Sequence, residues 1–153
     1  MEQEVNNPQS KLSGAFDEPT FAGKVAKEKN SRKKKAAPEV NILLEAVVHG
    51  MSEIKAKDIV IMDLRSVGNA MADYFVVCHG GSNTQVQAIA DSVERETTKL
   101  ADEKPLHVEG VRNAAWILMD YVDIVVHIFD KDSRTFYALE ELWADAVMTR
   151  IAE

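Results

Sequence analysis

The sequence has one cysteine in 153 residues, and this scarcity excludes two kinds of structure. A single thiol, Cys78, cannot form an intramolecular disulfide, and a zinc site built from cysteines needs several such ligands. Cys78 lies in the apolar run 74–79, where a cysteine usually serves as a small buried hydrophobic side chain. No neighbour in the sequence obviously lowers its pKa, so we expect no nucleophile there.

The chain also lacks long hydrophobic runs, and this absence excludes a membrane span. A charged residue interrupts each apolar run within about ten positions, whereas a bilayer-crossing helix needs roughly 20 apolar residues. Glu2 and Glu4 stand where a secretory signal carries positive charge, and no apolar segment follows them. We therefore predict a soluble, cytoplasmic protein with no membrane contact.

Basic residues are scarce in one part of the chain and concentrated in the other. Residues 1–38 carry eight Lys or Arg against five Asp or Glu, a net charge of +3, whereas residues 39–153 carry ten against twenty, a net charge of −10. An acidic body repels bare phosphate backbone, but it attracts the basic surface of another protein. The charge distribution therefore favours a protein partner.

The first 37 residues are polar and show no sustained apolar period, so we predict a disordered basic extension over 1–37 and one domain over 38–153. The extension contains a short basic run with two interpretations, a solvated linker or a weak phosphate contact with RNA. This run consists of Arg32, Lys33, Lys34 and Lys35.

Two helices are expected before the third apolar strand. Apolar residues recur at helical spacing from Val40 to Val47, with Gly50 as the expected stop. A second helix is predicted from Ser82 to about Leu100, because Ser82 and Gln85 form a capping-box pattern. Its inward stripe is expected to consist of Val86, Ile89, Ala90, Val93 and Leu100, with Asp91 and Arg95 on the outside.

Short β-branched and aromatic runs predict five strands, at residues 57–64, 74–79, 105–110, 115–121 and 123–129. The last two are close enough to pair as a hairpin. A final helix is expected after Asp132 or Ser133, either of which can cap it. Its apolar positions are Phe136, Leu139, Trp143 and Ala146. The order of elements predicts an α/β (α+β) fold, a mixed five-stranded sheet packed with helices.

The glycine-rich turn before the second helix has a phosphate-binding and a purely structural interpretation. Gly80, Gly81 and Ser82 precede a helix start, where free amides favour anions, but a turn and a helix cap account for the same residues. A nucleotidyltransferase would also need alternating carboxylates on the next strand to hold two magnesium ions. That strand offers Glu109 alone, with His107 where the second carboxylate is needed, so the metal-binding carboxylate pair is missing.

The segment 115–129 permits three interpretations: core, catalytic site or docking surface. Two-residue alternation puts Trp116, Leu118 and Asp120 on one strand face, with Asp123 at the adjoining turn and His127 further along the next strand. Carboxylates and a histidine could bind a metal, although such residues are commonly turn formers and hydrogen-bonded structural groups. An aromatic anchor beside negative charge is also typical of an interface with a basic partner, although periodicity alone favours Trp116 as a core residue.

Four blocks of the sequence resemble the Iojap family of ribosomal silencing factors. These are "ADYFVVCHGGSNTQVQAIADSV" (72–93), "EG" (109–110), "WILMDYVDIVVHIF" (116–129) and "RTFYALEELWADA" (134–146). The resemblance covers about residues 38–147 and does not include the first 37. The family often has glycine where Val122 stands, and because a β-branched residue resists positive φ, a left-handed turn is not assumed at the hairpin tip.

The resemblance implies a non-enzymatic factor without a cofactor or metal, which binds ribosomal protein L-fourteen on the large ribosomal subunit. It implies that the bound factor sterically prevents the small subunit from joining and so represses translation when nutrients are short. It also implies a nucleotidyltransferase-like fold without that chemistry, and a homodimer in solution. Partner contacts are expected at Trp116, Leu118, Asp120, Tyr121 and Asp123, with Glu109 and His127 as second candidates.

In this interpretation Trp116 and Leu118 are apolar anchors, Asp120 and Asp123 supply charge, and His127 could serve only to orient a carboxylate. The alternative is a metal-dependent nucleotidyltransferase or another nucleotide-using enzyme. Its candidate residues are Ser82, Asp91, Glu109 and Asp123.

Overall fold

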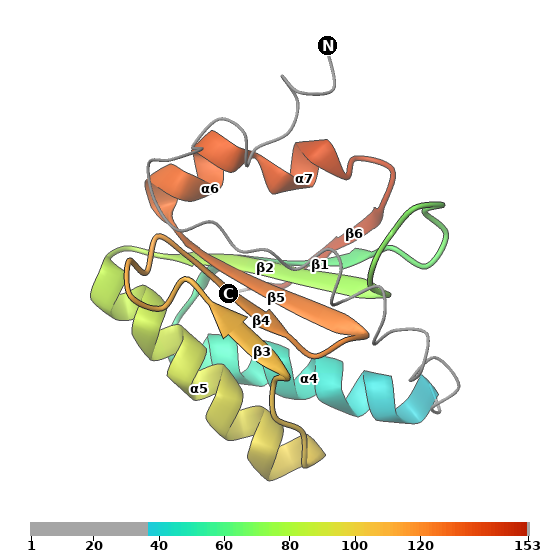
Figure 1. The fold of residues 1–153 in the computed structure, drawn as a ribbon, viewed down its shortest axis with the longest axis horizontal. Coiled ribbons are helices and arrows are strands. Elements are labelled where there is room, and N and C mark those ends of the chain that lie inside the picture. Colours follow the sequence, from blue (N-terminus) through green and yellow to red (C-terminus); the bar gives the residue numbers. More distant parts are fainter. Residues whose placement is uncertain (1–36, 153) are drawn as a thin grey trace.

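The chain folds around a mixed sheet of six strands with the order β3-β4-β5-β2-β1-β6 (Figure 1). This computed structural model describes residues 37–152, with side chains from Asn41 onward. β2 and β5 are parallel, and the other neighbouring strands are antiparallel. The strands are β1 (Lys57–Asp63), β2 (Tyr74–Gly80), β3 (His107–Glu109), β4 (Trp116–Asp120), β5 (Ile124–Asp130) and β6 (Val147–Arg150).

Helices lie on both sides of this sheet. α4 (Ala37–Glu53) and α5 (Asn83–Ala101) cover one face, and the short helices α6 (Lys131–Tyr137) and α7 (Leu139–Leu142) lie over the other (Figure 1). None of the helices described, from residue 37 on, is long and apolar enough to cross a membrane. The predicted mixed α+β class is confirmed, with one strand more than the five expected.

α4 continues through Gly50, so the prediction that this glycine stops the helix was wrong. A Cβ on Gly50 would lie 2.7 Å from the Cα of Val93 in α5. The Ser92 hydroxyl of α5 donates a hydrogen bond of 2.7 Å to the Gly50 carbonyl. Gly50 is therefore needed because two helix backbones approach each other closely, and not because of positive φ.

α5 begins as the sequence predicts. The Ser82 hydroxyl accepts a hydrogen bond from the Gln85 amide at 3.1 Å, and the Gln85 side-chain oxygen accepts one from the Gly81 amide at 2.7 Å. The inward stripe is buried from Val86 to Val93. Leu100 was wrongly assigned to it, because the last turn of α5 extends beyond the sheet and leaves Leu100 half exposed (Figure 1).

The C-terminal segment is not one helix. Ala138 adopts φ 48°, which ends α6 after two turns, and α7 begins at the next residue. The cap of α6 is Asp130, not Asp132 or Ser133, since an Asp130 carboxylate oxygen accepts a 2.8 Å hydrogen bond from the Ser133 amide. After α7 the chain returns to the sheet as β6, which pairs with β1.

Two hydrophobic cores result, one on each face of the sheet. The larger lies beneath α4 and α5 and includes Ile117 and Met119 of β4. The smaller lies on the α6 side and includes Trp116 and Leu118. The predicted alternation along this strand is therefore confirmed, and both of its faces are buried.

Candidate functional site

The hairpin of β4 and β5 brings most of the predicted partner-binding residues together. Leu118 lies directly opposite His127, and Trp116 lies opposite Phe129. Leu118 and Asp120 are almost fully buried, and Trp116 is only 2% exposed. In this conformation the predicted anchors are part of the molecule's packing, so whether they also contact a partner stays a prediction.

Trp116 sits in a cluster of aromatic rings. Its ring centroid lies 4.4 Å from that of Tyr137 in α6 and 5.0 Å from that of Phe129. Rings at these separations stabilise each other beyond the burial of their area. α6 therefore packs directly against the residue predicted as the main apolar anchor.

His127 accepts a hydrogen bond from Trp116. The indole Nε1 donates to His127 Nδ1 at 3.1 Å, and the Phe75 ring meets the imidazole edge-on at 4.6 Å. Complete burial lowers the pKa of His127 to about 3, so the ring is neutral at physiological pH, with its proton on Nε2. The Nδ1 atom thus orients the indole of Trp116.

The hairpin tip does adopt a left-handed turn. Val122 has φ 77°, although it is β-branched. An Asp120 carboxylate oxygen accepts a 2.8 Å hydrogen bond from the Val122 amide, which helps to hold this conformation. The backbone carbonyl of Asp123 accepts hydrogen bonds from the Asp73 and Tyr74 amides at 2.9 and 3.1 Å. Asp120 is therefore a buried turn former, and Asp123 is buried beside the same turn.

Tyr121 is separated from the other predicted contacts. It belongs to the core beneath α5, on the opposite face from Trp116. Its hydroxyl forms a 2.8 Å hydrogen bond with the Thr97 hydroxyl of α5. Burial raises the pKa of this phenol above its usual value.

Glu109 is the most accessible acidic group among the predicted contacts. It lies on β3, opposite Leu118, and its carboxylate contacts the imidazole of His107 on the same strand. Both side chains are partly exposed. β3 is an edge strand of the described sheet, so this pair lies nearer the surface than the other predicted contacts.

The residues of the alternative enzyme site do not converge. Ser82 follows the end of β2, whereas Asp123 precedes the start of β5. Because these two strands are parallel and in register over seven residues, Ser82 and Asp123 lie at opposite ends of the sheet, roughly 20 Å apart. Within residues 37–152, no group of three or more His, Cys, Asp or Glu side chains is placed to hold a metal ion.

The glycine-rich turn forms a helix cap. Side-chain groups of Ser82 and Gln85 already bond the Gln85 and Gly81 amides, which a bound phosphate would need. Cys78 is fully buried, and burial raises the pKa of its thiol to about 12. These two features match the structural interpretations of the turn and of the cysteine.

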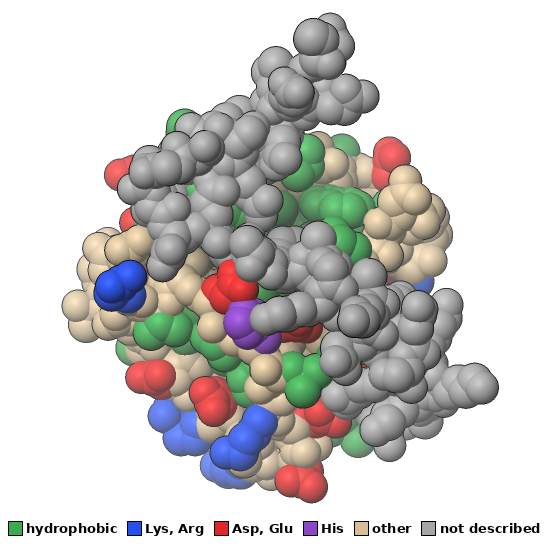
Figure 2. Space-filling model, viewed as in Figure 1, with side chains coloured by type: hydrophobic (Ala, Val, Ile, Leu, Met, Phe, Trp, Pro, Cys, Tyr) green, Lys and Arg blue, Asp and Glu red, His purple; other side chains and the backbone are tan. Residues whose placement is uncertain are grey.

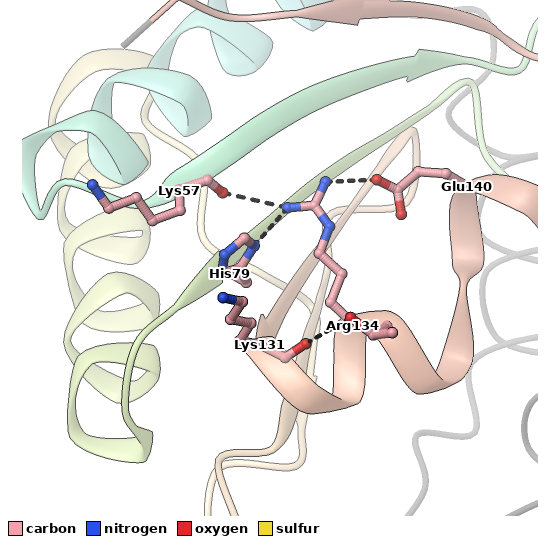
Figure 3. Close-up of polar contacts among 6 residues, drawn as sticks. Lys57, His79, Lys131, Arg134 and Glu140 are labelled. Carbon is pink, nitrogen blue, oxygen red and sulfur yellow. Dashed lines mark hydrogen bonds and ion pairs between the residues drawn. The ribbon is translucent and has the colours of Figure 1, made fainter.

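Arg134 was not identified from the sequence as a key residue. This buried side chain donates to the Lys57 carbonyl at 3.3 Å and to His79 Nδ1 at 3.0 Å, and it pairs with Glu140 of α7 at 2.6 Å (Figure 3). It thereby ties α6 and α7 to the ends of β1 and β2. No local pattern indicated this role, because its partners are up to 77 residues away in the chain.

Comparison with known proteins gives consistent matches. Residues 34–153 match the family described as ribosomal silencing factor during starvation. The ribosomal silencing factor of Bacillus subtilis is 43% identical over 107 residues, covering 68% of this chain and 86% of that protein. That of Halalkalibacterium halodurans is 41% identical over 107 residues, covering 68% and 87%.

Two further similarities of this chain are to a plant protein and to a solved structure. The chloroplastic protein Iojap of Zea mays is 36% identical over 101 residues, covering 62% of this chain and 40% of that protein. A crystal structure of a protein from Bacillus halodurans has a TM-score of 0.60 and 33% identity, covering 72% of this chain and 97% of the other.

Proposed function

The chain belongs to the ribosomal silencing factor family, and from this membership we propose that it represses translation by binding the large ribosomal subunit. In this proposal it contacts ribosomal protein L-fourteen and sterically blocks the joining of the small subunit. It acts without catalysis and without a cofactor, in the cytoplasm. The observation that carries the proposal is the family match over residues 34–153, which includes every strand and helix described.

Electrostatics supports a basic protein surface as the target. The segment 39–153 carries a net charge of −10, and such a field attracts a positively charged partner while it repels exposed RNA phosphates. The separation of Ser82 from Asp123 speaks against a shared nucleotide and metal site. A docking function is therefore better supported than the nucleotidyltransferase alternative.

We propose that contact centres on the β3–β4 side of the sheet face that carries Trp116. Glu109 can be reached directly, whereas Trp116 becomes accessible only if Tyr137 and other neighbouring side chains shift. Tyr121, on the opposite face, would act only by supporting β4 from beneath. The proposed contact set remains Trp116, Leu118, Asp120, Tyr121, Asp123, Glu109 and His127.

The remaining parts of the proposal concern organisation. We propose that residues 38–153 form the ribosome-binding domain and that the free protein is a homodimer. Residues 1–37 would be a basic extension able to make weak RNA contacts, and this prediction falls outside the residues that the structure describes. The residues concerned are Arg32, Lys33, Lys34 and Lys35.

Cosedimentation with purified ribosomal particles tests the function. We expect the full chain to sediment with free large subunits and to be absent from joined ribosomes. If it does not bind large subunits, or binds joined ribosomes equally well, the proposed function is wrong.

A charge reversal tests the site separately. Glu109→Lys places a cation on the accessible edge of the face and should weaken large-subunit binding by about tenfold or more, because a complementary charge becomes repulsive. Glu141→Lys makes the same change on the exposed surface of α7 and serves as the control. Trp116→Ala and Asp120→Lys are less informative, since both alter buried groups and would destabilise the fold. Equal binding by both charge variants would place the site elsewhere.

A further inference from the structure

A groove separates α5 from the β3–β4 edge of the sheet, on the opposite face from Trp116. Its volume is about 480 Å³. Hydrophobic side chains reach the surface on this side of the molecule, with acidic side chains beside them (Figure 2). The groove is lined by Gln87, Ala90, Asp91, Glu94, Val108, Val111, Ile117 and Met119.

The floor and the rim of the groove differ in chemistry. Val108 of β3 supplies a partly exposed apolar floor, with Ile117 and Met119 of β4 fully buried beneath it, and Val111 is an exposed apolar residue at the rim. Asp91 and Glu94, one turn apart on α5, supply two carboxylates. Among residues 41–152 neither carboxylate has an ion-pair partner within 4.0 Å, and no cationic side chain lines the groove.

The groove is held open by two amide side chains of α5. Gln87 Nε2 donates to the Val111 carbonyl at 3.0 Å, and Asn83 Nδ2 donates to the carbonyls of Asn113 and Ala114 at 2.9 and 3.1 Å. These bonds tie the loop 110–114 to the helix. Gly110 has φ 86°, and a Cβ at this position would lie 2.0 Å from the Trp116 carbonyl oxygen. The loop can turn there because glycine has no side chain. A preformed groove loses little entropy when a ligand binds.

β3 offers a backbone partner next to this groove. It is a terminal strand of the sheet and pairs with β4 on one side only within the described fold. An extended segment can add to such an edge through main-chain hydrogen bonds. Alternate side chains of an added strand would then point towards α5, over the apolar floor and the two carboxylates.

We propose that this groove binds an extended, basic polypeptide segment of a partner protein as an additional strand beside β3. Apolar side chains of the segment fill the groove, and an interleaved Lys or Arg lays its alkyl stem on Val111 and places its charge against Asp91 and Glu94. This groove lies on the opposite side of β4 from Trp116, so the proposed peptide binding is separate from the proposed ribosomal contact.

Charge favours a basic segment over a second copy of this chain as the occupant of the groove. Pairing two β3 edges would bring together two acidic domains, each with Asp91 and Glu94 at its groove, which costs free energy. Arg95, Lys99 and Lys104 line a neighbouring hollow to which Asp91 and Glu94 also contribute. The groove itself has no Lys or Arg in its lining, so on that side a cation of a bound segment meets only the two carboxylates.

A labelled full-length protein can test the proposal. Because Cys78 is the only cysteine and is fully buried, Val111→Cys introduces a unique reactive thiol at the groove rim for an environment-sensitive fluorophore. Val147→Cys places the same label on β6, at the opposite edge of the sheet. A short peptide of alternating leucine and arginine should give a saturable signal at position 111 and none at 147.

Charge variants and peptide variants decide the outcome. Asp91→Lys with Glu94→Lys should weaken peptide binding by about tenfold or more, whereas Glu141→Lys with Asp145→Lys, an equal charge change at exposed sites elsewhere, should weaken it much less. Equal loss in both pairs, or equal binding of a peptide with serine in place of leucine, would overturn the proposal. A position-111 signal that depends on protein concentration alone would assign the groove to a second copy of the chain. A signal that changes when residues 1–36 are deleted would assign it to this chain's own extension.

Discussion

At the scale of single residues, the contact between Trp116 and His127 links packing to protonation. A neutral imidazole can accept the indole proton at Nδ1, whereas a protonated one has no acceptor left. Burial without an adjacent compensating carboxylate at Nδ1 favours the neutral form and sets the pKa near 3. The aromatic cluster therefore depends on an uncharged His127.

Acid should destabilise the protein through this residue. The unfolded His127 has an ordinary pKa near 6.5, so between about pH 6.5 and pH 3 the unfolded state binds a proton that the folded state does not. The free energy of unfolding should be fully present above pH 6.5 and fall below it, by up to about 1.4 kcal/mol per pH unit. Urea denaturation of wild type and His127→Asn over this range measures the effect.

The asparagine variant is a matched comparison because its side-chain oxygen lies roughly where Nδ1 was and does not titrate in this range. Its free energy of unfolding should be lower at neutral pH but should decline less steeply in acid. His79, whose pKa is also lowered by burial, is present in both proteins and contributes equally. Parallel slopes for the two proteins would show that His127 is not the sensitive group.

At the scale of elements, the crossing of α4 and α5 depends on a position without a side chain. Gly50→Ala should lower the free energy of unfolding by about 1 to 3 kcal/mol, because the new methyl group would meet the backbone of Val93 and Ser92 at 2.7 to 3.0 Å. That loss outweighs the gain of up to about 1 kcal/mol in helix propensity. Thermal or urea denaturation provides the measurement.

Gly68→Ala is the control for this prediction. A Cβ at Gly68 would have no atom within 4 Å, so the substitution should change the free energy of unfolding only slightly. A stabilised Gly50→Ala protein would mean that the two helices can separate at little cost. The close approach would then not be a constraint on the fold.

Most helices and strands could be predicted because local sequence patterns specify them. The cap at Ser82 and the alternation from Trp116 to Asp120 are local patterns, and the structure contains both. β6 could not be found this way, since Val147–Arg150 is four residues long, mostly exposed, and pairs with a strand more than 80 residues earlier. The break at Ala138 was also missed, because a left-handed alanine has no sequence signature.

The candidate site was only partly predictable for a related reason. Alternation indicates which residues share a strand face, but it does not say what packs against that face. Tyr137 packs on Trp116 from α6, a helix that Arg134 ties to two strands through contacts distant in sequence. Val122 shows the same limit, since its side chain disfavours a turn that the Asp120 hydrogen bond stabilises.

At the scale of the whole molecule, the separation of charge is the feature that bears on association. The acidic segment 39–153 is joined to a basic extension, so the field that attracts a ribosomal protein also acts within the chain. Electrostatic attraction raises the rate of encounter more than it lowers the rate of dissociation. Rearrangement of Tyr137 over Trp116 would slow the step that follows encounter.

Association and dissociation should respond differently to salt. Raising ionic strength from about 0.05 to about 0.5 M should lower the association rate constant with large subunits by about tenfold or more, because screening shortens the range of attraction. The dissociation rate constant should change much less, since it depends on short-range contacts. Stopped-flow fluorescence with a label on Val147→Cys, on the sheet edge opposite β3, follows both rates. Glu141→Lys with Asp145→Lys reduces the negative charge by four without altering the proposed contacts, and it should slow association at low salt only. An association rate that is unaffected by salt would show that charge does not steer this protein to its partner.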